Sequence, residues 1–292
     1  MELWLLYAVG AAVFAALTTI LAKIGIKNVD SHLATAIRTV VVLLFAWLMV
    51  FIVGSQNGIA DIQGRTWLLI IVSGLATGAS WLCFFKALKL GNVNKVVPID
   101  KSSTVLTILF AFIFLREQVT IFNIIGVVLI GIGTWLMLDL KKTAASDEKQ
   151  NKSWLIYALL AAISAALVAI IGRMGVVDID ANLWTALRTV VVVPLSLVMV
   201  FMVGSHKQLR DVGKKSWLFL VLSGFATGAS WLFFYHALQL GNASLVVPID
   251  KLSIVLTMGF SRAILGERFN KKSLIGLFIL TVGTLLPVFF TS

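Results

Sequence analysis

Two stretches of this chain occur twice, and they decide its fold. SGLATGASWL at residues 73–82 returns as SGFATGASWL at 223–232, and VVPIDK at 96–101 returns unchanged at 246–251. The same offset of 150 residues relates Trp4 to Trp154 and Glu117 to Glu267, without gaps. The match predicts a tandem duplication, with one copy in residues 1–139, a hydrophilic linker in 140–153 and a second copy in 154–290.

Composition places both copies in a membrane. The chain is 60% hydrophobic and only 13% charged, whereas a soluble domain needs far more polar surface. Polar residues fall between apolar runs of about 20 residues, the length of a helix that crosses the hydrocarbon layer. We therefore predict an all-α membrane protein of ten transmembrane helices. Their ranges are 3–22, 33–53, 67–88, 96–115, 121–138, 154–172, 183–203, 217–238, 246–265 and 273–290.

An odd number of helices per copy implies that the two copies enter the membrane from opposite sides. The basic residues agree, because the Lys and Arg content of successive loops changes phase between the copies. We predict two inverted five-helix repeats, superimposable after a half-turn about an axis in the membrane plane, as in many secondary transporters. The more basic set of loops includes the linker, which the positive-inside rule places in the cytoplasm, with both termini outside.

Charged residues inside spans are costly, so they are candidates for a transport pathway. Arg38 and Arg188 lie about five residues inside matching spans, roughly 7 Å deep, in the segments TAIRTVV and TALRTVV. The neighbouring threonines favour a side that faces a cavity. The alternative is a side chain that extends to the membrane interface.

A second polar cluster follows the proline of the fourth span in each copy. Asp100 precedes Ser103 and Thr107 at spacings that put all three on one helix face. The cluster consists of Asp100, Lys101, Ser103 and Thr107, and of Asp250, Lys251, Ser253 and Thr257 in the second copy. We interpret these stripes as cavity lining. The alternative is an aspartate that only caps a helix start beside an interfacial lysine.

The third spans carry deep tryptophans, Trp81 and Trp231, which either stack on a solute or pack in the core. Loop order brings Arg38 and Asp100 to one membrane side, and Arg188 and Asp250 to the other. We therefore expect two Arg–Asp pairs that act as gates, leaving the lysines to hold a carboxylate. Gly74–Gly78 and Gly224–Gly228 have the spacing of close helix packing.

Both halves resemble the EamA family of the drug/metabolite transporter superfamily. The shared marks are a proline early in the fourth helix, a glutamate at its end and a glycine-rich fifth helix. They appear as Pro98 with Glu117, Pro248 with Glu267, and GVVLIGIG at 126–133. The resemblance implies ten helices in two inverted repeats and transport of metabolites or drugs. It also implies cytoplasmic termini, opposite to the charge count, and PIDK departs from the common family pattern.

These features predict a secondary active transporter, most simply an exporter, that works by alternating access. Two bases and one acid per cluster favour a zwitterionic or anionic metabolite such as an amino acid, with protons as a coupling ion. We expect a multi-pass protein of the bacterial plasma (inner) membrane, with membrane lipid and a small solute as partners. The sequence leaves the oligomeric state open, and a monomer is a plausible form.

Other functional classes fit the sequence less well. A cationic-drug exporter would carry an acidic residue in its first helix, and spans 1 and 6 contain none; a lipid flippase stays open as an alternative. The single cysteine, Cys83, and the three histidines form no catalytic or metal-binding pattern. We therefore predict no enzyme activity, no cofactor and no nucleic-acid partner.

Overall fold

The computed structural model describes residues 3–26, 29–90, 99, 103–118, 120–137, 153–265 and 271–291. All regular structure in these ranges is helical. Two predicted site residues, Asp100 and Lys101, lie outside the described residues, as do Pro98, Glu267 and nearly all of the predicted linker.

The helices follow the predicted order in both copies. The first copy has α1 (Leu3–Gly25), α2 (Ser31–Val53), η2 (Ser55–Asp61), α3 (Gly64–Leu90), α5 (Ser103–Leu115) and α6 (Ile121–Met137). The second has α7 (Ser153–Val176), α8 (Ala181–Val203), η4 (Ser205–Asp211), α9 (Lys214–Leu240), α10 (Ala243–Lys251), α11 (Ser253–Leu265) and α12 (Lys271–Thr291). Seven described segments are long and apolar enough to cross a membrane, and three shorter apolar helices accompany them. The all-helical class is confirmed, whereas the count of ten spans stays a prediction.

Local sequence sets the ends of α2 and α8 in the same way. Asp30 precedes α2 and accepts hydrogen bonds from the first backbone N–H groups, and Asp180 does the same for α8. Both helices end at a glycine in the left-handed conformation, Gly54 at φ 79° and Gly204 at φ 81°, which residues with a Cβ rarely adopt.

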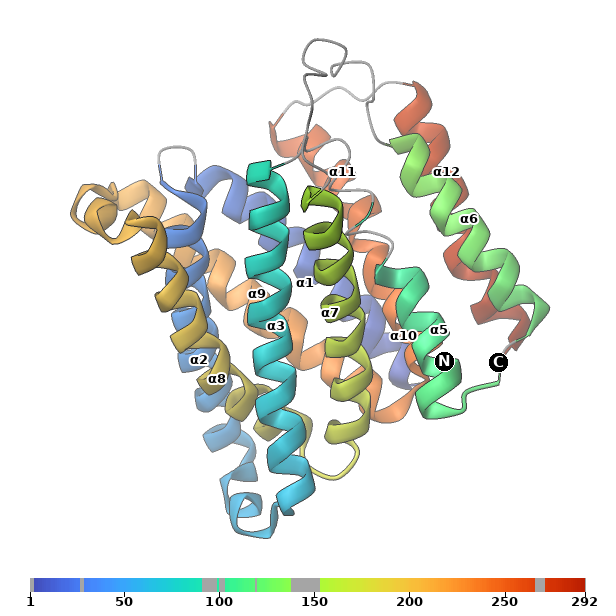
Figure 1. Cartoon of the computed structure of the whole chain (residues 1–292), viewed down its shortest axis with the longest axis horizontal. Coiled ribbons are helices and arrows are strands. Elements are labelled where there is room, and N and C mark those ends of the chain that lie inside the picture. Colours follow the sequence, from blue (N-terminus) through green and yellow to red (C-terminus); the bar gives the residue numbers. More distant parts are fainter. Residues whose placement is uncertain are drawn as a thin grey trace.

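The two copies run in opposite directions. The Ser205 hydroxyl, just after α8, donates to the Asp30 carboxylate at the start of α2 over 2.6 Å. At the other end, Gly58 after α2 packs against Leu183 near the start of α8. The corresponding helices α2 and α8 are therefore antiparallel neighbours, and in Figure 1 they form one flank of the molecule.

The opposite flank is made by α6 and α12, which cross through glycines (Figure 1). Gly126 lies against the Gly283 carbonyl, and Gly133 lies against the Gly276 carbonyl. A Cβ on Gly126 or Gly133 would stand 2.6 Å from the facing oxygen, so only glycine permits this approach. Because 126 corresponds to 276 and 133 to 283, the crossing is symmetric.

Between the flanks, helices of one copy pack on helices of the other. Each such contact occurs a second time between the equivalent helices, with the roles of the two copies interchanged. α1 packs on α9 and α3 packs on α7, while α1 also meets α11 and α5 meets α7. Hydrogen bonds repeat the exchange: Ser80 donates to the Ala161 carbonyl over 3.1 Å, and Ser230 donates to the Ala11 carbonyl over 3.0 Å. Such exchanged contacts are those of a two-fold relation between antiparallel copies.

The predicted glycine contacts form across the same boundary. Gly74 and Gly78 of α3 lie against Val191 and Leu195 of α8. Their equivalents in α9, Gly224 and Gly228, lie against Val41 and Phe45 of α2. These contacts bring α3 and α9 close to the two helices that carry the predicted arginines.

Candidate functional site

One face of α9 connects the two arginines. Thr227, Trp231 and Tyr235 are four residues apart and therefore lie along one side of the helix. Thr227 bonds to Arg38 at one end of this face, and the rings of Trp231 and Tyr235 lie beside Arg188 at the other. Two cavities are found along this face, and Trp231 lines both.

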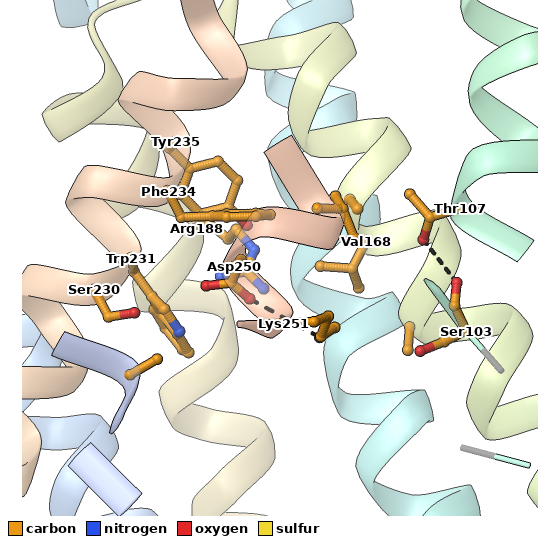
Figure 2. Close-up of a pocket in the computed structure, with 14 residues that line it drawn as sticks. Ser103, Thr107, Val168, Arg188, Ser230, Trp231, Phe234, Tyr235, Asp250 and Lys251 are labelled. Atoms are coloured by element: carbon orange, nitrogen blue, oxygen red, sulfur yellow. Dashed lines mark hydrogen bonds and ion pairs between the residues drawn. The ribbon is translucent and has the colours of Figure 1, made fainter. Parts of the chain in front are cut away.

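The larger cavity, here the Arg188 cavity, has a volume of about 270 Å³. Figure 2 shows Trp231, Phe234, Tyr235, Arg188 and Asp250 together, with Ser103 and Thr107 across from them. The cavity therefore joins polar residues of α5 in the first copy to charged residues of the second. Its described polar and aromatic lining residues are Ser103, Thr107, Arg188, Ser230, Trp231, Phe234, Tyr235, Asp250 and Lys251.

Arg188 is buried, at 3% exposure, by contacts to both copies. Its Nε donates to the Ser73 hydroxyl over 3.0 Å, and its Nη2 donates to the Thr77 hydroxyl over 2.6 Å. The guanidinium carbon lies 5.0 Å from the Trp231 ring centroid and 5.4 Å from that of Tyr235. Hydrogen bonds and cation–π contacts offset the cost of placing this charge inside the protein.

These partners differ from the predicted ion pair. Arg188 bonds to hydroxyls of α3, whereas the Asp250 carboxylate lies 3.9 Å from the Lys251 ammonium. The expectation of a direct Arg188–Asp250 pair is therefore wrong for this conformation. The reason is that α3 of the other copy, brought in by its glycines, offers hydroxyls directly beside the guanidinium.

Asp250 and Lys251 stand at a break in the fourth span of the second copy. α10 ends at Lys251, α11 begins at Ser253, and Pro248 inside α10 lacks the N–H of a regular helix. Ser253 and Thr257, on α11, are half-buried and lie outside the described lining of both cavities.

The start of α10 is held by a residue of the first copy that the sequence analysis did not assign to the site. Glu117 accepts hydrogen bonds from the backbone N–H of Ala243 over 2.7 Å and of Ser244 over 3.0 Å. Its carboxylate thus caps the helix, whose first turn carries partial positive charge. The one sequence feature that could have indicated this role of Glu117 is its position at the end of the fourth predicted span.

The second cavity, here the Arg38 cavity, has a volume of about 240 Å³. Arg38 Nη2 donates to the Thr227 hydroxyl over 3.0 Å, but Arg38 Nε is buried and has no hydrogen-bond partner among the described residues. The described lining consists of Thr35, Arg38, Thr39, Trp81, Thr227 and Trp231.

The two arginines therefore hold equivalent positions but have different partners. Ser73 accepts from Arg188, whereas its equivalent Ser223 donates to the Thr18 carbonyl of α1 over 2.9 Å. Arg38 consequently keeps the threonine contact and lacks the serine contact. Ser73 was also missed by the sequence analysis, because a serine in a small-residue stretch gives no signal of its partner in another copy.

Comparisons with known proteins agree on the class of protein. One relative is an uncharacterized transporter in the cobO 3' region of a Sinorhizobium species, 45% identical over 134 residues, which cover 46% of this chain and 95% of the relative. Another is the uncharacterized transporter YxxF of Bacillus subtilis, 27% identical over 245 residues, covering 84% of this chain and 76% of the relative.

A solved crystal structure shares the fold, with a TM-score of 0.78 at 15% identity, over 97% of this chain and 95% of that one. The model of the EamA-like transporter family matches residues 2–139 and again residues 152–289, one match for each copy. Together with its apolar helices, these matches make the chain a multi-pass integral membrane protein. It belongs to the EamA-like transporter family, within the drug/metabolite transporter superfamily.

Proposed function

We propose that this protein is a secondary active transporter that moves a small zwitterionic or anionic solute across the bacterial plasma membrane by alternating access. The supporting observation is the unequal bonding of two equivalent arginines. Arg188 holds both a serine and a threonine of the other copy, whereas Arg38 holds only a threonine. Copies of nearly the same local sequence thus adopt two conformations at once.

The second state of the transporter follows from exchanging these conformations. Ser223 would leave the Thr18 carbonyl and accept from Arg38 Nε, while Ser73 would leave Arg188 and bond to the carbonyl of Val168, the equivalent of Thr18. Each state keeps one hydrogen bond between a serine and an arginine, so neither state has a prohibitively high free energy. Trp231, which lines both cavities, would stay between them.

The charge of the Arg188 cavity supports the solute class. Arg188 and Lys251 contribute two positive charges, and Asp250 is the one acidic residue among the described lining. The excess positive charge suits a solute with a carboxylate and opposes an organic cation. Asp250 is also the group that would accept a proton in a coupled cycle, since a cavity carboxylate can exchange its proton with either side.

Paired serine variants test alternation. In a Cys83→Ala background, single cysteines at Thr35 and Ala165 report access to the Arg38 and Arg188 cavities, respectively, by an impermeant thiol reagent. Ser73→Ala should disfavour the present state, because it loses a charge-assisted bond, and Ser223→Ala should disfavour the exchanged state. In each variant we expect labelling to rise at one reporter and to fall at the other, and the two variants should change it in opposite senses. Both variants should also slow the uptake of amino acids or organic anions into liposomes. Alternation by exchange of the two serine contacts would be refuted if labelling changed in the same direction at both reporters. It would also be refuted if labelling did not change and uptake stayed normal.

A further inference from the structure

We infer that the Arg38 cavity is a binding site for a small organic anion, whose carboxylate bonds to Arg38 and whose flat apolar body lies between Trp81 and Trp231. The inference rests on the proposed transport function. Of the two solute classes named there, zwitterions and anions, it selects anions. The first observation is the buried Arg38 Nε, which has no hydrogen-bond partner among the described residues. A buried donor without a partner is costly, and this one belongs to a charged group.

The threonine hydroxyls of the cavity carry no negative charge that could balance the Arg38 guanidinium. Thr35 donates to the Ser31 carbonyl, Thr39 to the Thr35 carbonyl and Thr227 to the Ser223 carbonyl, each over 2.7–2.8 Å. Their protons are therefore used within their own helices. The described lining also contains no acidic residue, so none of the described residues of the cavity supplies a negative charge to Arg38.

The equivalent arginine shows what Arg38 lacks. Arg188 has two hydroxyl acceptors and two aromatic rings against its guanidinium, and it is 3% exposed. Arg38 has one hydroxyl acceptor and a cavity of about 240 Å³ beside it. A planar carboxylate fits the remaining N–H donors of a guanidinium, which an isolated hydroxyl cannot match.

The rest of the cavity selects the body of the anion. Trp81 and Trp231 contribute large apolar indole surfaces, and each indole carries one N–H donor. Such walls favour a flat or aromatic carboxylate over a strongly hydrated inorganic anion. Since Trp231 also lines the Arg188 cavity, an anion held here would lie next to the second positive site.

Benzoate tests the site, with benzamide as a neutral molecule of nearly the same shape. Equilibrium binding of radiolabelled benzoate is measured on the full-length protein in lipid nanodiscs, with unlabelled benzamide as competitor. We expect Arg38→Gln to weaken benzoate binding about tenfold or more, because it removes the charge-assisted hydrogen bonds. Arg38→Lys, which keeps the charge and guards against a folding defect, should weaken binding by a smaller factor, and Trp81→Ala should also weaken it.

Arg173→Gln is the matched control, because this partly buried arginine of α7 bonds to the Gln239 carbonyl and lies outside both described linings. It should bind benzoate like the unmodified protein. The inference is overturned if benzamide competes as well as benzoate, if Arg38→Gln binds normally, or if the unmodified protein does not bind benzoate. Uptake into liposomes separates the two proposals: transport of zwitterions without benzoate binding refutes only the anion site, and benzoate binding without any transport refutes only the transport function.

Discussion

Glu117 of the first copy caps a helix of the second: its carboxylate accepts the backbone N–H of Ala243 over 2.7 Å. A second bond, from Ser244 over 3.0 Å, fixes the same helix start. α10 carries Asp250 and Lys251 at its other end, so this contact holds the charged side of the Arg188 cavity in place.

Glu117→Ala should therefore lower stability and slow transport together. Loss of a helix cap costs about 1 kcal/mol, and the freed end of α10 would loosen the position of Asp250. The measurement is the apparent melting temperature of purified protein in detergent, alongside uptake into liposomes. Gln118→Ala, at the exposed neighbouring residue, serves as the control. Equal melting temperatures for the two variants would show that the Glu117 cap does not contribute to the stability of the protein.

The glycine crossing of α6 and α12 gives a position-specific prediction. Gly133→Ala would place a methyl group 2.6 Å from both the Gly276 carbonyl oxygen and the Leu280 nitrogen. Backbone atoms cannot move aside locally, so we expect a loss of about 2 kcal/mol from overpacking. Gly131→Ala, two residues away, has no atom within 4 Å of the new methyl group. If thermal unfolding of both variants matches that of the unmodified protein, the crossing is looser than described.

Asp30 makes stability depend on pH. Burial alone would raise the pKa of this carboxyl, but hydrogen bonds from the Ser205 hydroxyl and from the N–H groups of Leu33 and His32 outweigh it, so the pKa is lowered. A carboxyl with a lowered pKa in the fold stabilises it above the unfolded pKa, and this contribution is lost as pH falls through the folded pKa.

We therefore expect the melting temperature of the unmodified protein to fall more steeply than that of Asp30→Asn as pH drops from about 5 to about 3. Ser205→Ala, which removes one of the hydrogen bonds, should give an intermediate slope. Parallel pH profiles for all three proteins would rule out a stabilising role for the Asp30 carboxylate.

Arg188 and Arg38 should respond differently to the same substitution. Arg188→Lys loses the Nε bond to Ser73 and weakens the cation–π contacts of the guanidinium with two rings, at a cost of about 2 kcal/mol, since an ammonium cannot reproduce that geometry. Arg38→Lys loses no serine bond, so about 1 kcal/mol or less is expected. Apparent melting temperatures in detergent rank the two variants. A larger loss for Arg38→Lys would contradict the unequal bonding of the two arginines.

The sequence by itself determined the architecture. Apolar length identifies spans because the hydrocarbon layer has a fixed thickness, and capping residues such as Asp30 and Gly54 act on their own helix. The gapless offset of 150 residues and the odd number of predicted spans per copy implied opposed copies, and the contacts of α2 with α8 and of α6 with α12 have that arrangement. The sequence also predicted Arg188, Asp250 and Trp231 as pathway residues, because charge and deep indoles inside spans need a polar or packed environment. All three line the Arg188 cavity, and their role in transport stays a prediction.

Only the tertiary structure decided which groups meet. Hydroxyls of α3 rather than an aspartate surround Arg188, since partners from opposite copies depend on how helices cross. Likewise, Glu117 acts through backbone N–H groups 126 and 127 residues away. The difference between Arg38 and Arg188 could not be read from TAIRTVV and TALRTVV at all. Nearly identical local sequences have nearly identical local preferences, so the inequality arises from the packing of one copy against the other.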